Sequence, residues 1–356
     1  MRVSIIIPAF NADRTIAECL TACLQQTHPD CEIIVVDDGS TDRTAEVLEE
    51  FSKKLPGTIG TIGTIGTIGT DPDLGCGSAA LSSSVLYVRQ QNKGPAAARN
   101  LGAAHGSGDI FAFTDSDCVP RPDWIERLLE GFTEGVVGVG GTYGIANPHS
   151  LLARMLDEEI AARHELSRGD VDFVGSFNVA YVRSAFEAAG GFDEAFSKAS
   201  AEDNDLSYRL RDAGGGLRFR PDAIVAHYHP TRIWPYLRTQ ARHGYWRMKL
   251  YRKHPRRART GDQYASVIDL TAPPLALTLC VALPAQALWG WPLNMAALLL
   301  ALAYAFVRVP LVQQMYWRTR DFRMYLFGLV ALLRDIARGL GMVAGILRFF
   351  IGPITR

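Results

Sequence analysis

Two carboxylates, Asp115 and Asp117, follow directly after the apolar run Ile110–Thr114. A buried strand that ends in two acids so closely spaced is a natural seat for a hard divalent cation. Mg²⁺ and Mn²⁺ prefer oxygen ligands, and Mg²⁺ sites commonly use one or two carboxylates together with substrate phosphates. The ordinary alternative is a solvated turn, since Asp and the intervening Ser116 are common turn residues. The surrounding segments decide between the two interpretations.

Short β-branched runs alternate along the N-terminal part with segments whose apolar residues recur at helical spacing. The expected strands are 3–7, 33–36, 85–88 and 110–113, and the expected helices are 15–26, 44–51 and 95–104. This alternation predicts an α/β fold with a doubly wound, mostly parallel sheet. Ligands bind such sheets outside the carboxyl ends of the strands. The residues at those ends are Pro8, Asp37, Asp38, Asp115 and Asp117.

Several short motifs occur in a fixed order along residues 1–230. They are 7–11 (Ile-Pro-Ala-Phe-Asn), 36–42 (Val-Asp-Asp-Gly-Ser-Thr-Asp), 92–94 (Asn-Lys-Gly) with 98–100 (Ala-Arg-Asn), 115–117 (Asp-Ser-Asp), 190–194 (Gly-Gly-Phe-Asp-Glu) and 202–203 (Glu-Asp). The ordered set resembles the family 2 glycosyltransferases of GT-A fold. The resemblance implies a Rossmann-like nucleotide-binding half and transfer of a sugar from a nucleotide diphosphate donor, with inversion at the anomeric carbon.

The donor must be held by its base, ribose and diphosphate. Asp38 is suited to accept hydrogen bonds from base or ribose, with Asp37 assisting, and Arg99 and Lys93 are suited to a pyrophosphate. For Lys93, a solvated loop lysine is an equal alternative. Asn178 is expected to hydrogen-bond a sugar hydroxyl, and the alternative is that it simply belongs to a short buried strand. The expected donor-binding residues are Pro8, Ala9, Phe10, Asn11, Asp37, Asp38, Lys93, Arg99, Asp115, Ser116 and Asn178.

The resemblance also assigns the metal and the catalytic residues. It implies Mg²⁺ or Mn²⁺ held by Asp115 and Asp117, with His227 as a third ligand after the strand expected at 221–226, and His229 as its rival. Asp203, next to Glu202, is expected to be the general base that deprotonates the acceptor hydroxyl. The competing explanation is that these two acids simply favour the start of a helix.

Formal net charge is zero, with 37 basic and 37 acidic residues, but the charges are unevenly distributed. Residues 242–259 hold many basic residues and no acid, whereas 270–307 hold no charge. A transmembrane helix needs about 20 apolar residues, so a helical hairpin of 270–288 and 292–307 is expected, with both ends cytoplasmic by the positive-inside rule. For 322–351, an interfacial amphipathic helix is favoured over a third crossing, because Arg334, Asp335, Arg338 and Arg348 interrupt the apolar sequence.

The basic segment invites a nucleic-acid interpretation, but beside a membrane hairpin it more economically binds anionic lipid or the phosphate of a lipid-linked acceptor. The expected acceptor-side residues are Arg242, Tyr245, Trp246 and Arg247. Residues 240–247 and 253–255 resemble the exopolysaccharide-type members with C-terminal membrane helices, and depart from the processive cellulose- and chitin-type synthases. Addition of one sugar to a lipid-linked or glycolipid acceptor is therefore expected, and no nucleic-acid partner.

The expected organisation is a cytoplasmic catalytic domain at 1–235, a basic juxtamembrane segment at 236–265 and membrane-associated helices at 266–356. The Gly-Thr-Ile repeat makes 56–84 a flexible loop insertion without chemistry. Six cysteines without a C-x-x-C pair fit a reducing cytosol, and no N-terminal signal is visible. We expect an enzyme of the cytoplasmic membrane with UDP as the commonest donor base by resemblance. The alternatives are a catalytically silent scaffold and a sugar nucleotidyltransferase.

Overall fold

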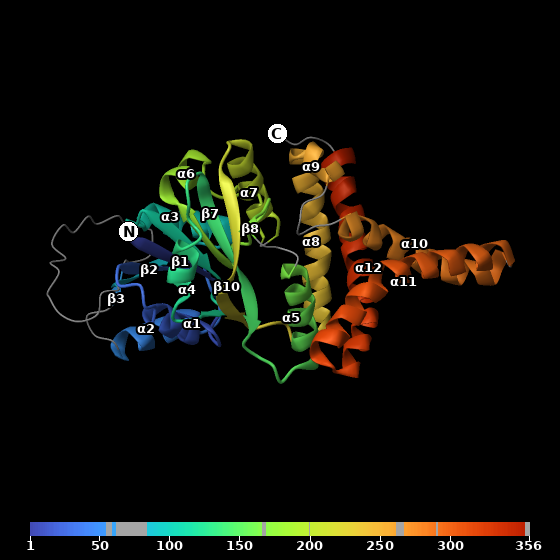
Figure 1. Ribbon diagram of the computed structural model, residues 1–356, viewed down its shortest axis with the longest axis horizontal. Coiled ribbons are helices and arrows are strands. Elements are labelled where there is room, and N and C mark those ends of the chain that lie inside the picture. The colour runs from blue at the N-terminus through green and yellow to red at the C-terminus, as the bar shows by residue number, and fades with distance from the viewer. Residues whose placement is uncertain are drawn as a thin grey trace. The chain divides into compact units, whose positions relative to one another are not determined.

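The computed structural model describes residues 1–54, 59–61, 84–165, 169–198, 200–260, 267–289 and 291–352. The chain forms two compact units (Figure 1): unit 1 comprises residues 1–146 and 168–228, and unit 2 comprises 147–167 and 229–356. Within the repeat insertion at 56–84, residues 59–61 form a short strand that pairs with its neighbour. Nearly all of the rest of that insertion lies outside the described residues.

Unit 1 is built on one mixed sheet in the order β3-β4-β2-β1-β5-β9-β7-β10-β6, with β8 paired to β10. The strands are β1 (Val3–Ala9), β2 (Cys31–Asp37), β3 (Ile59–Thr61), β4 (Ser84–Arg89), β5 (Ile110–Thr114), β6 (Cys118–Pro120), β7 (Val136–Ile145), β8 (Gly169–Asp170), β9 (Asn178–Val182) and β10 (Gly216–His227). The predicted parallel arrangement is confirmed from β3 to β5. Beyond β5 the sheet becomes mixed, because β9 runs antiparallel between β5 and β7.

Both faces of the central strands are buried, which explains their nearly continuous apolar sequences. Ile5, Ile7 and Val35 belong to one core cluster, whereas the alternate residues Ile6 and Ile34 belong to another. The helices of unit 1 are α1 (Ile16–Leu24), α2 (Thr44–Lys54), α3 (Pro95–His105), α4 (Trp124–Leu129), α6 (Arg183–Ala188) and α7 (Glu202–Asp212). The sheet is therefore a middle layer that places its strand ends at a common edge.

Unit 2 is helical (Figure 1). Its elements are α5 (Leu151–His164), α8 (Ile233–Lys253), α9 (Pro255–Thr260), α10 (Val267–Trp289), α11 (Trp291–Thr319), a 3₁₀ turn η1 (Phe322–Leu326), α12 (Phe327–Ile346) and a π-helical turn η2 (Leu347–Ile351). Helices α10 and α11 pack together. Among the described residues, one helical segment, Met295–Thr319, is long and apolar enough to cross a membrane, and Leu270–Ala282 is a shorter apolar helix. Within the part of the chain that the structure describes, the second arm of the predicted hairpin therefore lies in a helix that meets the length and composition requirement.

Helix α12 buries two charged residues and exposes several apolar ones. Arg334 and Asp335 are fully buried, whereas Leu329, Leu340 and Val343 are exposed. A water-facing helix would show the reverse pattern. Two of the charges that weighed against a membrane crossing at 322–351, Arg334 and Asp335, thus lie inside unit 2, whereas Arg338 is half-buried and Arg348 is exposed.

The buried charges of unit 2 are paired across its helices. Arg334 donates to both oxygens of Glu159 at 2.5 Å, and Arg308 donates two hydrogen bonds to Asp335 at 2.8 and 2.9 Å. Although burial opposes it, the guanidinium groups of Arg334 and Arg163 hold the pKa of Glu159 down to about 2. Glu159 is therefore ionised at neutral pH, as buried ion pairs require.

Helices α8 and α12 approach closely at glycines. A Cβ added to Gly341 would overlap the carbonyl oxygen of Ala241, and one added to Gly244 would overlap that of Arg338. Small residues at a helix crossing let two backbones come together, as in packed membrane helices. The crossing therefore does not admit larger side chains at these positions.

We predict that Gly341→Ala lowers the free energy of unfolding by about 1–3 kcal/mol, because the added methyl group overpacks the α8–α12 crossing. The matched control is Gly328→Ala, in the same helix, where an added Cβ meets nothing within 4 Å. The control should be neutral or slightly stabilising, because Ala favours the helix more than Gly does. Thermal unfolding of detergent-purified protein measures both, and equal shifts would contradict the packing argument.

Candidate active site

The turn between β5 and β6 holds the Asp115–Asp117 motif. The backbone N–H of Cys118 donates to the carbonyl of Asp115 at 3.0 Å, which closes this turn. The thiol of Cys19, on α1, contacts the same carbonyl at 3.5 Å. The turn is therefore held from both sides, and Asp115 and Asp117 are fixed at the carboxyl end of β5.

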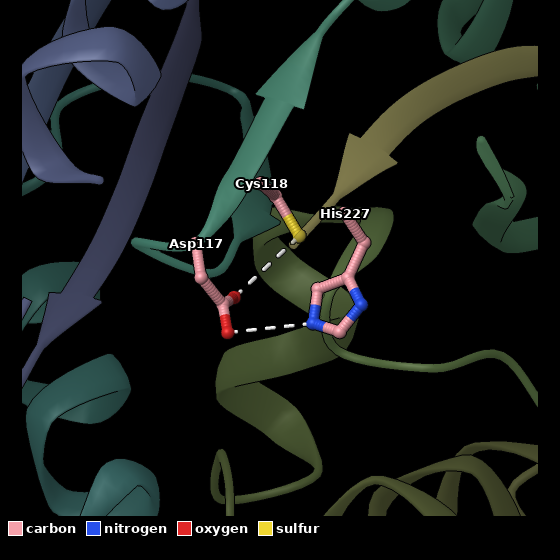
Figure 2. A group of neighbouring side chains, drawn as sticks. All are labelled: Asp117, Cys118 and His227. Atoms are coloured by element: carbon pink, nitrogen blue, oxygen red, sulfur yellow. Dashed lines mark hydrogen bonds and ion pairs between the residues drawn. The ribbon is translucent and has the colours of Figure 1, made fainter. Parts of the chain in front are cut away.

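The pairing of β10 with β6 brings His227 to this turn. In the antiparallel register His227 lies opposite Cys118, and the backbone N–H of Tyr228 donates to the carbonyl of Asp117 at 3.0 Å. The Nε2 atom of His227 lies 3.3 Å from Oδ2 of Asp117. Figure 2 shows that Asp117, Cys118 and His227 point toward one another, and their possible ligand atoms all lie within 4.8 Å of each other.

Aromatic rings fix the orientation of the imidazole. The ring of Tyr143 lies 4.8 Å from that of His227, and Tyr143 itself stacks on Phe177 at 3.6 Å. The rival histidine, His229, belongs to unit 2, where its Nε2 lies 3.3 Å from Asp157. His227 is thus the histidine that lies beside Asp117. The carboxylate, imidazole and thiol of this group are all donors that a divalent cation accepts.

Asp115 is engaged by a different partner. Arg99, on α3, is 2% exposed and donates to Asp115 at 2.7 Å and to Glu202 at 2.9 Å. Its guanidinium carbon also lies 5.5 Å from the centre of the Phe192 ring. Despite burial, the two carboxylates raise the pKa of Arg99 above its ordinary value. Arg99, predicted to reach a pyrophosphate, is instead an internal clamp between two predicted site residues.

The clamp fixes the start of α7. Glu202 is buried, and its second oxygen accepts from the backbone N–H of Ser200 at 2.6 Å. Ala201, just before the helix, has a left-handed backbone with φ of 71°, a conformation that costs a residue with a Cβ and often occurs at functional sites. Asp203 follows with its side chain partly exposed. Of the two predicted acids, Glu202 is held inside and Asp203 remains accessible.

The Gly-Gly-Phe-Asp-Glu motif is anchored by Asn100, the residue after the clamp. Its side-chain oxygen accepts from the backbone N–H of Phe192 at 2.9 Å, and its nitrogen donates to the carbonyl of Phe192 at 2.9 Å and to Glu194 at 3.0 Å. Gly191 has a φ of 66°, and a Cβ there would lie 2.7 Å from the Asn100 oxygen. The motif therefore shapes the chain that leads to α7.

The acids at the end of β2 accept hydrogen bonds from neighbouring groups of the protein. Asp37 is fully buried and accepts from the backbone N–H of Ser40 at 2.8 Å and from the hydroxyl of Tyr87 at 3.1 Å. Asp38 accepts from Gln90 and from the backbone N–H groups of Lys93 and Gly94 at 2.7–2.9 Å. Both acids thus organise the strand-end loops, including the one that carries Lys93.

The N-terminal motif, of which Pro8 to Asn11 are predicted to bind the donor, lies at the end of β1. Ala9 is buried and Phe10 is 48% exposed, and Asn11 has a φ of 52°. The side-chain oxygen of Asn11 accepts from the backbone N–H of Thr41 at 2.8 Å. The loops after β1 and β2 are therefore tied together, and Phe10 is the exposed apolar side chain beside them.

Asn178 is not available to a sugar. It is fully buried, its amide nitrogen donates to the carbonyls of Thr142 and Ala223 at 2.9 Å, and its oxygen accepts from the indole of Trp124 at 2.7 Å. Both donor positions are used within the protein. Asn178 joins β9, β7 and β10 and is not included in the site proposed below.

The predicted acceptor residues lie together on α8 of unit 2. The ring of Tyr245 lies 5.3 Å from that of Trp246 and 4.9 Å from that of Phe349 on η2. The guanidinium of Arg247 lies over Tyr251 at 5.9 Å, and Arg242 is exposed. The segment thus combines aromatic rings packed on η2 with basic side chains.

Cys118 directly follows the Asp115–Asp117 motif but was not among the predicted site residues. Its side chain is fully buried, and this burial and the Asp117 carboxylate raise the pKa of the thiol. The signal available in the sequence was its position at the start of a strand whose partner was unknown.

The mixed sheet, with acids and a histidine at its strand ends, defines a glycosyltransferase fold of GT-A type. Residues 1–245 match the family described as "Glycosyltransferase like family 2", and the chain belongs to this family. It is 37% identical over 173 residues to the pre-mycofactocin glycosyltransferase of Mycobacterium tuberculosis, covering 46% of this chain and 36% of that protein. It is 29% identical over 229 residues to glycosyltransferase AglE of Haloferax volcanii, covering 63% and 66%.

The chain thus spans about one third to two thirds of the length of these relatives. Among solved structures, it is similar to the mannosyltransferase PcManGT of Pyrobaculum calidifontis, solved with GDP-Man and Mn²⁺, with a TM-score of 0.63 and 20% identity over 96% of this chain and 87% of that one. It is also similar to residues 1–349 of S. aureus TarS, with a TM-score of 0.51 and 18% identity over 100% and 93%. These likenesses establish the fold.

We predict that Glu202→Gln lowers the free energy of unfolding by about 3–5 kcal/mol, because it removes one partner of a buried ion pair. The control is Glu187→Gln, which removes an exposed i,i+4 pair with Arg183 at 2.8 Å and should cost only about 0.3–0.5 kcal/mol. Chemical denaturation measures both. A small effect of Glu202→Gln would mean that Arg99 does not depend on this pair.

Proposed function

We propose that the chain is an inverting, metal-dependent glycosyltransferase. It moves one sugar from a nucleotide diphosphate sugar to a hydroxyl of a lipid-linked saccharide or glycolipid. The observation that carries the proposal is the convergence of Asp117 and His227 at the strand edge, joined through the Arg99 clamp to the helix that begins with Glu202 and Asp203.

The metal site is proposed to use Asp117 and His227, with Asp115 at its margin because one of its oxygens already accepts from Arg99. Carboxylate and imidazole donors fit Mn²⁺ well and Mg²⁺ through the carboxylate. When bound, the cation neutralises the diphosphate and stabilises the departing nucleotide. Lys93, on the loop held by Asp38, and Ser116 are proposed to contact the diphosphate.

The chemical step is proposed to depend on Asp203. Its carboxylate accepts the proton of the acceptor hydroxyl while that oxygen attacks the anomeric carbon from the face opposite the diphosphate. A new carbon–oxygen bond forms as the bond to the diphosphate oxygen breaks, which inverts the configuration. Glu202, paired with Arg99, is not a base but fixes the beginning of α7, so that Asp203 is presented in one orientation.

The donor is proposed to carry uridine, with guanosine and thymidine as alternatives. Phe10 is the exposed aromatic ring at the end of β1 and is suited to stack on a base, while Asn11 and Asp38 hold the surrounding loops. The similar mannosyltransferase structure holds GDP-Man, so GDP-sugars belong in any donor panel.

The acceptor is proposed to be lipid-linked and the enzyme to act at the cytoplasmic face of the cytoplasmic membrane. The apolar helix Met295–Thr319 is long enough to cross a bilayer, and α12 turns its apolar side outward. Arg242 and Arg247, with Tyr245 and Trp246, are proposed to bind the phosphate and headgroup region of the acceptor. The proposed domains are the catalytic residues 1–235, the basic segment 236–265 and the membrane region 266–356.

We predict that Asp203→Asn lowers turnover by about 10²–10⁴-fold, the usual contribution of general-base catalysis, and leaves donor binding unchanged. Release of nucleotide diphosphate is measured from UDP-, GDP- and dTDP-sugars with Mn²⁺ or Mg²⁺ and membrane lipid extract. Asp212→Asn, an exposed acid at the other end of the same helix, is the control and should retain full activity. Full turnover by Asp203→Asn would remove this residue from the role, and silence of the wild type across the panel would favour a scaffold.

We predict that the lipid product gains a single sugar. The mass of the extracted product, measured after exhaustive reaction with the active donor, should exceed that of the acceptor by one hexosyl or comparable residue. A ladder of masses or a long homopolymer would contradict the proposal and indicate a processive synthase.

A further inference from the structure

The proposed metal group contains a sulfur donor. Cys118 starts β6 and lies directly opposite His227 in the antiparallel ladder, where side chains of paired residues project to the same face. Its Sγ lies 3.9 Å from Oδ1 of Asp117. Figure 2 shows the thiol directed into the space that Asp117 and His227 border. The strand register thus brings Cys118 beside His227.

The location gives a cation access to the thiol from one side. Cys118 is fully buried, while the side chains of Asp117 and His227 are 45% and 18% exposed. The sulfur therefore forms the inner wall of the group, and the carboxylate and imidazole form its open side. The turn beneath it is supported by Cys19, whose thiol contacts the carbonyl of Asp115.

The three donors distinguish between classes of cation. Mg²⁺ and Ca²⁺ take oxygen ligands, whereas Zn²⁺ and Co²⁺ bind thiolate, imidazole and carboxylate together. Zinc bonds are about 2.0–2.3 Å long, so the donors, now within 4.8 Å of one another, need only a modest approach. The Asp117 side chain is 45% exposed, so it can shift toward the other two donors.

We propose that Cys118 is a third protein ligand of this centre and that the centre binds thiophilic divalent cations such as Zn²⁺ through Asp117, Cys118 and His227. Binding forms a metal–sulfur bond, breaks the S–H bond and releases the proton to solvent. The inference rests on the proposed metal-binding role of Asp117 and His227. It adds that Zn²⁺ competes with the cation that supports sugar transfer.

Cobalt tests the sulfur ligand directly, because a cobalt–thiolate bond gives a charge-transfer absorption in the near ultraviolet. Co²⁺ is titrated into full-length protein in which Cys76 and Cys280 are replaced by Ser, so that neither contributes. We expect the absorption to appear at one equivalent, to vanish in the additional Cys118→Ser variant and to persist in Cys31→Ser, a buried cysteine of β2. No absorption in the background protein, or one that survives Cys118→Ser, would overturn the proposal.

Metal affinity gives a second readout. Zn²⁺ binding, measured by competition with a chelating dye, should weaken about tenfold or more in Cys118→Ser, while Mn²⁺ binding measured by electron paramagnetic resonance should stay within about twofold, because Mn²⁺ does not select sulfur. Equal losses for both cations would indicate damage to the site and contradict a sulfur ligand. Far-ultraviolet circular dichroism of Cys118→Ser and Cys118→Ala identifies a variant that fails to fold. The cobalt absorption of the background protein tests the proposal without any Cys118 variant.

The two proposals fail separately. Cobalt absorption without sugar transfer from any donor would leave the sulfur ligand standing and remove the proposed function. Metal-dependent transfer without the absorption, and without competition by Zn²⁺, would leave the function standing and remove Cys118 from the centre.

Discussion

The active-site region of unit 1 depends on one buried cation, the guanidinium of Arg99. Removing such a charge from water costs several kcal/mol unless carboxylates compensate for it. Asp115 and Glu202 do so at 2.7 and 2.9 Å, and the Phe192 ring lies beneath the charge at 5.5 Å. One side chain thus joins the end of β5, helix α3 and the start of α7. The next residue, Asn100, fixes the chain between them.

The sequence was sufficient to predict which residues gather at the sheet edge, because parallel strands place their carboxyl ends together. Asp37, Asp38 and Asp115 lie at such ends, and Asp117 comes together with the predicted His227. Burial of alternate residues on both faces followed from the apolar runs. The family resemblance, which was drawn from the ordered set of motifs along residues 1–230, is confirmed by the match over residues 1–245.

The partner of each side chain could not be predicted, because it depends on long-range register. Arg99 was assigned to a pyrophosphate but is buried against two acids. The side chain of Asn178 hydrogen-bonds to β7, β10 and Trp124, because β9 runs antiparallel within the sheet. Cys118 enters the metal group only through the pairing of β6 with β10. In unit 2, the charges of α12 looked like an obstacle to a lipid environment, but Arg334 and Asp335 are paired inside and the outer side is apolar.

The central claim is that a divalent cation and a nucleotide diphosphate share the edge of the sheet beside Asp117 and His227. Calorimetric titration of UDP, GDP and dTDP into detergent-purified protein, with Mn²⁺ and then with EDTA, tests it most directly. One nucleotide is expected to bind with Mn²⁺, and this binding should be lost with EDTA or in Asp117→Ala. Equal affinity with Mn²⁺ and with EDTA, or in the wild type and Asp117→Ala, would contradict it.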